Sequence, residues 1–196
     1  MVVSDVSTEP MRRAGALPGW WRRAVAGPSA WPRRLAGTVL AFAGLLVSLR
    51  LAFFQYDLVA SVWEPWFGDG SVRVLDSAFS RALPVRDAAL GAAAYLAELV
   101  LELSGGTERW RRRPWLVLLL GLLAVAMAAT AVFLLALQVF VVGSFCTLCL
   151  VSAAVSLTMP LLVAEEVIAA WRQVRRSRRY GLSWLRAVRG NVPDAH

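Results

Sequence analysis

Apolar residues gather in four long runs, which cover residues 35–56, 87–103, 115–142 and 145–164. A helix needs about 20 mostly apolar residues to cross the hydrocarbon core of a membrane. The second run is the shortest, and the third is the most apolar. This pattern predicts an all-α membrane protein whose core is a four-helix transmembrane bundle.

Charged and proline-rich segments flank these runs. Residues 1–34 read as an Arg- and Pro-rich tail, and residues 165–196 as an Arg-rich amphipathic tail that we expect on the membrane surface. Residues 35–164 would then form the membrane domain. The chain is thus predicted to be one membrane domain between two polar tails.

The loop between the first and second runs, residues 57–86, contains a helical signal of its own. A Gly-Asp-Gly sequence at residues 68–70 marks a turn, and Ser71 is a suitable helix cap. Apolar residues then recur at helical spacing, namely Val72, Leu75 and Phe79. We expect a short amphipathic helix here that docks on the bundle as a lid.

Arginine clusters orient the predicted helices. The chain carries 21 basic residues, all of them Arg. Six lie in the N-terminal tail, four in residues 109–113 and seven in the C-terminal tail, while the link between the third and fourth runs is uncharged. Because such clusters stay on the cytoplasmic side, we predict a multi-pass plasma (inner) membrane protein with both termini cytoplasmic. The loop helix then lies on the outer side.

Composition favours membrane lipid as the surroundings and argues against a nucleic-acid partner. Hydrophobic residues make up 58% of the chain and charged residues 17%, with a mean hydropathy of +0.58. A soluble domain has more charged residues than this. The net charge of +8 comes from Arg beside apolar runs. No contiguous basic face with stacking aromatic residues is visible, as binding to nucleic acid would require.

The only two cysteines form a Cys-x-x-Cys pair. Cys146 and Cys149 begin the fourth run, at its predicted outer end. A spacing of three places both sulfur atoms on one helical face, close enough to bridge. The partial positive charge of a helix N-terminus favours thiolate over thiol. The outer compartment is also the oxidising one. The pattern therefore indicates a redox-active disulfide near the outer face.

Two other interpretations of the cysteines were weighed. A structural metal site needs four ligands, and the sole histidine, His196, is at the far terminus, so we expect no metal. Alternatively, the cysteines are two small buried core residues, because free cysteine often behaves as a hydrophobe.

Several segments together resemble the vitamin K epoxide reductase family of quinone-coupled membrane thiol oxidoreductases. They are VSLRLAFFQ in the first run, SVRVLDSAFS in the loop, LPVRDAALGAAAY at the second run and LQVFVVGSFCTLCLVSA across the last two. The resemblance implies a four-helix bundle around a quinone, either menaquinone or ubiquinone. It also implies that Cys149 faces the quinone and that Cys146 exchanges disulfides with an external thiol protein or small thiol. Asp87 matches a position that can hydrogen-bond a quinone oxygen, and Ser77 a loop serine.

The chain departs from the family pattern in two places. The family's loop cysteine pair would align near Trp63 and Ser71, and neither position holds cysteine, so the chain resembles a bacterial-type homologue without that pair. The aromatic residue that caps the quinone in some members is replaced by Ala153. The relay of electrons through the loop is therefore missing.

Further polar and aromatic residues are candidates for the quinone site: Asp87, Phe54, Trp63, Phe67 and Gln138. Each has a simpler interpretation. The aromatic residues can anchor the loop at the membrane interface, and Asp87 can act as a helix N-cap. Glu98 and Glu102 lie deeper, where we expect them to pair with Arg109 and Arg111–Arg113.

The function predicted from these features is transfer of electrons between a thiol partner and a membrane quinone through the Cys-x-x-Cys pair. The alternative is a non-catalytic membrane scaffold of the same family, which binds quinone or protein without turnover. The missing loop cysteines keep both possibilities open.

Overall fold

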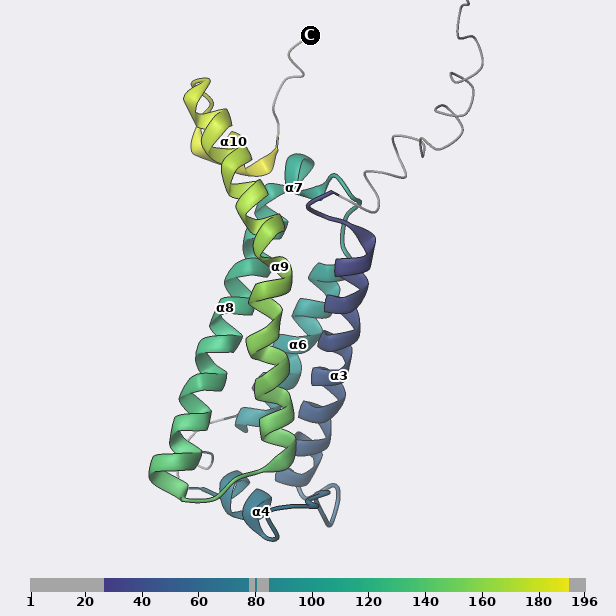
Figure 1. Cartoon of the computed structure of the whole chain (residues 1–196), viewed down its shortest axis with the longest axis vertical. Coiled ribbons are helices and arrows are strands. Elements are labelled where there is room, and N and C mark those ends of the chain that lie inside the picture. Colours follow the sequence, from purple (N-terminus) through teal and green to yellow (C-terminus); the bar gives the residue numbers. More distant parts are fainter. Residues whose placement is uncertain (1–26, 78–79, 81–84, 191–196) are drawn as a thin grey trace, which may run out of the picture.

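The computed structural model describes residues 27–77, 80 and 85–190, and these residues form helices and connecting loops. The long helices are α3 (Trp31–Gln55), α6 (Asp87–Leu103), α8 (Pro114–Leu137) and α9 (Thr147–Arg179). The short ones are α4 (Gly70–Leu75), α7 (Arg109–Arg112), the π-helical turn η1 (Gln138–Val142) and α10 (Trp184–Arg189). The long helices run side by side, with α4 at one end and α7 and α10 at the other (Figure 1). Residues 1–26 of the predicted tail, Phe79 and residues 191–196 lie outside the described residues.

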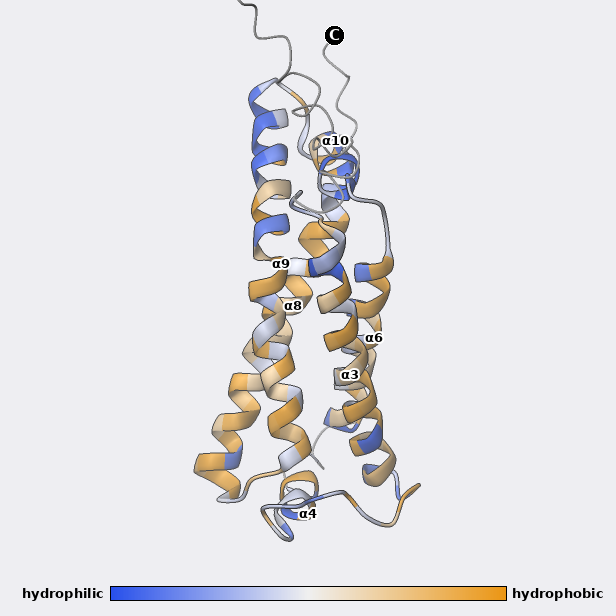
Figure 2. Ribbon diagram, turned by 45° about the vertical axis from the view of Figure 1, so that its right-hand side comes forward, coloured by the Kyte–Doolittle hydropathy of each residue, from blue (hydrophilic) through white to orange (hydrophobic). Residues whose placement is uncertain are grey.

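Within the described residues, three helices are long and apolar enough to cross a membrane. They are α3, the continuous Pro114–Val142 segment of α8 and η1, and α9, with mean hydropathies of 1.9, 2.7 and 2.0. Apolar residues cover most of these helices, whereas hydrophilic residues gather on the part of α9 near α10 (Figure 2). The predicted second run forms α6 with 17 residues, and α6 is not among these three helices. The structure is therefore that of an all-helical protein compatible with a membrane.

Helix α3 begins at Trp31, four residues before the predicted start of the first run. Pro32 fits the first helical turn because its nitrogen has no hydrogen to leave unpaired. Arg34 is buried, and its guanidinium donates to the carbonyl oxygens of Glu102 (2.5 Å) and Gly105 (3.1 Å). Tertiary hydrogen bonds thus hold Arg34, a residue of the predicted tail, inside the bundle.

Helix α9 does not end at Ala164, where the fourth run was expected to stop. It continues through Pro160 and on to Arg179. Its buried positions beyond the expected end recur every three or four residues, namely Glu166, Ala170, Val174 and Ser177. This stripe faces α7 and α10, which both contact α9. The buried positions of residues 166–177 therefore pack against protein, and the location of this tail at the membrane surface stays a prediction.

A buried ion cluster joins the helices at the end that contains α7, α10 and the last turns of α9, here called the arginine end. Arg109 donates to Glu166 through Nε (2.5 Å) and Nη2 (2.7 Å), and to Glu102 through Nη2 (3.2 Å). Ser29 also donates to Glu166. Burial disfavours the charged form of Arg109, but the hydrogen bonds and charge of Glu166 outweigh it and raise the pKa of Arg109.

The predicted pairing of the two acids in the second run is only half correct. Glu102 pairs with Arg109, but Glu98 is completely buried and neither of its carboxyl oxygens has a hydrogen-bond partner among the described residues. The side chains of Arg111–Arg113 are exposed. Glu98 lies one helical turn from Glu102 along α6, on the side of Tyr95, which belongs to a buried cluster with Ala41 and Met159. The arginines that follow Arg109 do not reach it.

Candidate functional site

Cys146 and Cys149 form a disulfide at the start of α9. Cys146 is the N-cap residue, with extended backbone angles, and its sulfur accepts a hydrogen bond from the backbone N–H of Cys149 (3.2 Å). The three-residue spacing brings the two Cα atoms to 5.2 Å, within the usual range for a disulfide. The predicted pairing of the two cysteines at a helix start is thus present. We call this end of the bundle, with α4, the cysteine end.

The two cysteines have different surroundings. Cys146 is completely buried in an apolar cluster with Leu51 of α3, Leu75 of α4 and Ala88 of α6. Cys149 is half-buried and lines a cavity inside the bundle. The Cys146 sulfur is therefore covered, with α4 packed against it, whereas Cys149 lies in the cavity wall.

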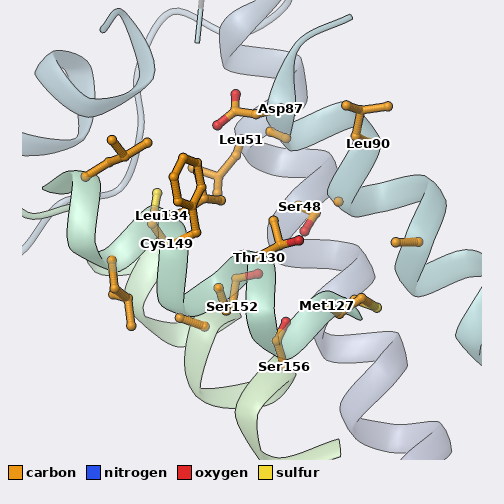
Figure 3. A pocket seen from close by; sticks show the side chains of 18 of the residues that line it. Ser48, Leu51, Asp87, Leu90, Met127, Thr130, Leu134, Cys149, Ser152 and Ser156 are labelled. Atoms are coloured by element: carbon orange, nitrogen blue, oxygen red, sulfur yellow. The ribbon is translucent and has the colours of Figure 1, made fainter. Parts of the chain in front are cut away.

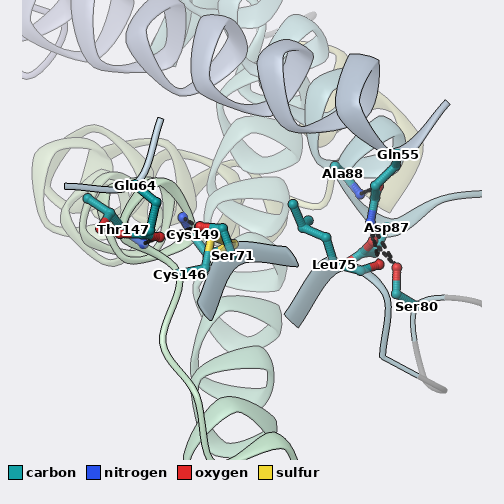
Figure 4. The surroundings of a disulfide bond; sticks show 10 residues. All are labelled: Gln55, Glu64, Ser71, Leu75, Ser80, Asp87, Ala88, Cys146, Thr147 and Cys149. Carbon is teal, nitrogen blue, oxygen red and sulfur yellow. Dashed lines mark hydrogen bonds between the residues drawn. A yellow bond between two sulfur atoms is a disulfide. The ribbon is translucent and has the colours of Figure 1, made fainter. Parts of the chain in front are cut away.

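Glu64 fastens the loop to the start of α9. Its Oε2 accepts from the backbone N–H of Thr147 (2.9 Å) and from the Ser71 hydroxyl, and its Oε1 accepts from the Thr147 hydroxyl (Figure 4). Burial works to raise the pKa of Glu64, but the hydrogen bonds from Ser71 and Thr147 outweigh it, and the pKa is lowered. Glu64 thus satisfies a free N–H at the helix terminus directly beside Cys146.

Ser71 does not cap the loop helix as predicted. Helix α4 begins at Gly70 with Asp69 as its N-cap residue, which makes no capping hydrogen bond through its side chain. Ser71 is fully buried and uses its hydroxyl for Glu64 instead. The Ser71 hydroxyl donates to Glu64, which contacts the start of α9, and it therefore does not form the cap that the sequence pattern predicted.

The cavity beside Cys149 has a volume of about 480 Å³. Its walls come from all four long helices, α4 and η1, and they include a group of hydroxyl-bearing residues: Ser48, Ser77, Tyr95, Thr130, Ser152 and Ser156. Cys149 and Asp87 lie toward one end of the cavity, and Ser156 and Met127 toward the other (Figure 3). A mostly apolar cavity of this size with a few polar groups suits a small organic ligand.

Asp87 belongs to a polar network at one end of this cavity. Its Oδ1 accepts from Gln55 Nε2 (2.6 Å) and from the Ser80 hydroxyl (2.8 Å). Gln55 Oε1 in turn accepts from the backbone N–H of Ala88 (3.3 Å). Asp87 is the first residue of α6 and makes no capping hydrogen bond through its side chain. Its interpretation as an N-cap is therefore wrong, and the backbone N–H of Ala88 is satisfied by Gln55.

Gln138 lines the same cavity from η1. Its side chain is buried, and Oε1 has no hydrogen-bond partner within the described residues. A buried amide oxygen without a donor is costly unless a ligand or water supplies one. Gln138 and Asp87 are thus the two candidate residues of the sequence analysis that the structure places beside Cys149 in the cavity wall.

The three aromatic candidates lie outside the cavity wall. Phe54 packs on the apolar cluster around Cys146. Trp63 is 60% exposed and stacks edge-on against Trp66. Phe67 packs on Phe145, with ring centroids 5.5 Å apart. None of these three rings therefore lines the space beside Cys149.

The sequence analysis missed three functional candidates, namely Glu64, Gln55 and Tyr95. Tyr95 is almost fully buried in α6, and its hydroxyl donates to the carbonyl oxygen of Ser152 (2.7 Å) and lies 2.8 Å from the Ser156 hydroxyl. A polar residue inside an apolar run was the signal available for Gln55 and Tyr95. No group of three Cys, His, Asp or Glu side chains in the described part of the chain is placed to hold a metal ion.

A model of the vitamin K epoxide reductase family matches residues 35–164, which span the start of α3 to the middle of α9 and include the disulfide and the cavity. The search of curated proteins finds no match. Since the family model covers most of the chain, this helical protein with its Cys146–Cys149 disulfide belongs to the vitamin K epoxide reductase family.

Proposed function

We propose that this protein is a membrane thiol–disulfide oxidoreductase that passes electrons from an external thiol to a membrane quinone. The observation that carries the proposal is the position of Cys149, whose sulfur belongs to a disulfide and also lines the cavity. Family membership supports redox chemistry in a membrane. The apolar walls and scattered hydroxyl groups suit a quinone ring better than a charged substrate.

In the proposed reaction the Cys146–Cys149 disulfide is first reduced and then formed again. A partner dithiol attacks Cys146, the Cys146–Cys149 bond opens, and the partner leaves as a disulfide. The reduced pair then gives two electrons to a quinone in the cavity through Cys149 and closes again. Two thiol protons are released, and the quinone takes up two protons to become a quinol. Gln138 and Asp87 are the residues in the cavity wall that would hydrogen-bond the ring oxygens.

We further propose that α6 crosses the membrane as a fourth span and that the cysteine end faces outward. The Arg-rich surfaces of α7, α9 and α10 then lie in the cytoplasm, as the positive-inside rule requires. Trp66 tests this orientation because it is 72% exposed beside α4. A Trp66→Cys variant should react with a membrane-impermeant maleimide in intact cells. Labelling only after cell lysis would contradict the proposed orientation.

The absence of other cysteines means that the partner thiol must reach Cys146 directly. Cys146 is completely buried under Leu75 in the closed structure. Helix α4 must therefore lift before exchange can start. Helix α4 has only six residues, and Glu64 attaches it to the start of α9. We therefore expect α4 to be the part of the site that is easiest to displace.

The proposal is tested with purified protein, ubiquinone or menaquinone analogues and dithiothreitol. We expect loss of quinone absorbance, and the Cys149→Ala variant should abolish it. Thr158→Ala is the matched control, because Thr158 is exposed on the same helix and bonds only the carbonyl oxygen of Ala154. Quinone reduction that persists at the full rate in Cys149→Ala would refute the assignment.

The burial of Cys146 also favours a second candidate function, a non-catalytic scaffold in which the disulfide is only structural. Trapping of thiols with a mass tag in living cells separates the two. A redox-active pair should appear in both reduced and oxidised forms and shift with added reductant. A pair that stays fully oxidised in the presence of reductant would support the scaffold.

A further inference from the structure

A column of polar side chains is buried along one face of α6. Tyr95, Glu98 and Glu102 recur at spacings of three and four residues and therefore share this face. Each is no more than 2% exposed. On α3, a Cβ added to Gly37 would lie 2.8 Å from Glu102, and one added to Gly44 would lie 2.4 Å from Tyr95. Small residues on α3 thus leave the room that these polar side chains fill.

Glu98 stands in the middle of this column without a hydrogen-bond partner. It is completely buried, and both carboxyl oxygens are unpaired within the described residues. Tyr95 on one side and Glu102 on the other lie close enough to interact electrostatically with it. Burial of a lone carboxylate is very costly, and an ionisable group inside a membrane bundle is a candidate for proton transfer by default.

The column lies between two cavities, one toward each end of the bundle. At the cysteine end, Tyr95 lines the cavity beside Cys149. At the arginine end, Arg109 lines a second cavity of about 440 Å³, formed by residues 105–109, 112 and 113. Arg109 pairs with Glu102, and Glu102 is the neighbour of Glu98. Polar groups therefore follow one another from the second cavity to the first.

We propose that Glu98 carries protons from the arginine end to the cavity beside Cys149. This inference rests on the proposed thiol–quinone reaction. Oxidation of two external thiols releases two protons at the cysteine end and sends two electrons through Cys149. The quinone binds two protons as it becomes quinol, and these arrive from the arginine end through Glu102, Glu98 and the Tyr95 hydroxyl. The reaction would then separate charge across the membrane.

The test uses the full chain in liposomes that contain a ubiquinone analogue in the bilayer and a pH-sensitive dye in the lumen. Reduced glutathione, which does not cross the bilayer, is added outside and reaches only molecules whose cysteine end faces outward. We expect the lumen to become more alkaline as quinone is reduced. Glu98→Gln keeps the shape of the side chain but cannot release a proton, and should slow quinone reduction ~10-fold or more.

Two controls separate proton transfer from a structural role. Glu98→Asp retains an ionisable group and should recover much of the rate and of the luminal alkalinisation. Glu165→Gln makes the same change at a mostly exposed carboxylate that pairs with Arg33, and should leave both unchanged. If a variant unfolds in liposomes, the wild-type infrared difference spectrum between reduced and oxidised protein still decides, because a protonated carboxyl band must change with the redox state.

Each outcome decides between the proposals. Quinone reduction in wild type together with full speed and unchanged luminal alkalinisation in Glu98→Gln would overturn the proton route alone. Quinone reduction with protons taken only from outside would do the same. Wild-type protein that reduces no quinone would refute the thiol–quinone function and, with it, the route that serves that function.

Discussion

The two ends of the bundle are held together by different forces. At the arginine end, Arg109 joins α6 and α9 through two buried carboxylates, Glu102 and Glu166. At the cysteine end, the six-residue α4 is held by the half-buried Glu64 and by the contact of Leu75 with Cys146. Buried charges cannot separate without leaving an unpaired charge, whereas Glu64 can exchange its partners for water. We therefore expect the arginine end to stay closed and the cysteine end to open.

The largest effect is expected from breaking the arginine end. Arg109→Met removes the cation and leaves Glu102 and Glu166 as unpaired acids in the bundle interior. Removal of one partner of a buried pair costs about 3–5 kcal/mol. We expect the free energy of unfolding in detergent, measured by denaturant titration, to fall by that amount.

Arg112→Met is the matched control for this experiment. Arg112 is 80% exposed and pairs with Glu108 one turn earlier on the surface. An exposed pair of this kind contributes only about 0–1 kcal/mol. Equal stability losses in the two variants would show that the buried cluster does not hold the arginine end together.

The sequence predicted the helices of this bundle better than it predicted their ends. The apolar runs locate α3, α6, α8 and the first part of α9, because membrane helices carry a strong local signal. The extension of α9 to Arg179 depends on Ala170 and Val174 packing against elements distant in sequence. Hydrophobic periodicity shows that such a face is apolar, but not whether protein or lipid covers it.

At the cysteine end, removal of the charge of Glu64 should loosen α4, the lid over Cys146. Glu64→Gln weakens the hydrogen bonds from Thr147 and Ser71, and hydrogen bonds to charged groups contribute about 1.5–3 kcal/mol. Reduction of the Cys146–Cys149 disulfide by glutathione should become ~10-fold faster, since 1.4 kcal/mol is a factor of ten in population. The measurement is the rate of thiol appearance at fixed pH.

Asp69→Asn provides the comparison for Glu64→Gln. Asp69 lies in the same loop, and its side chain makes no capping hydrogen bond to α4. The variant changes the charge of the loop equally without touching the start of α9. If both variants accelerate reduction to the same extent, the charge of the loop matters and the specific contact with Thr147 does not.

The same contact should make the lid sensitive to acid. Because the hydrogen bonds lower the pKa of Glu64, the closed lid gains stability from the carboxylate above the ordinary value of 4.5, and this gain is lost as pH falls through the lowered pKa. Hydrogen exchange of residues 64–76, corrected for its intrinsic pH dependence, should therefore rise in wild type below pH 4.5. In Glu64→Gln it should already be high at neutral pH and change little with acid.

Single residues of the candidate site could be recognised in the sequence, but the contacts between residues far apart in the chain could not. The Cys-x-x-Cys spacing revealed the disulfide, and polar residues inside apolar runs pointed to Asp87 and Gln138. The partners are separated too widely for any local pattern: Glu64 and Thr147 are 83 residues apart, and Gln55 and Asp87 are 32 apart. For the same reason the loop aromatics were expected at the quinone, although Trp63 and Phe67 lie outside the cavity wall.

The smallest effect is expected from a substitution in the cavity wall. Gln138→Leu removes a buried amide oxygen that has no partner among the described residues, so the free energy of unfolding should stay constant or rise by ~1 kcal/mol. If the amide binds the quinone, the quinone KM should rise a few-fold, while reduction of the disulfide by glutathione keeps its rate. Trp63→Ala should leave the quinone KM unchanged, because Trp63 lies outside the cavity wall. An increase in KM with Trp63→Ala but not with Gln138→Leu would reverse this assignment and place the quinone under the lid, beside Cys146.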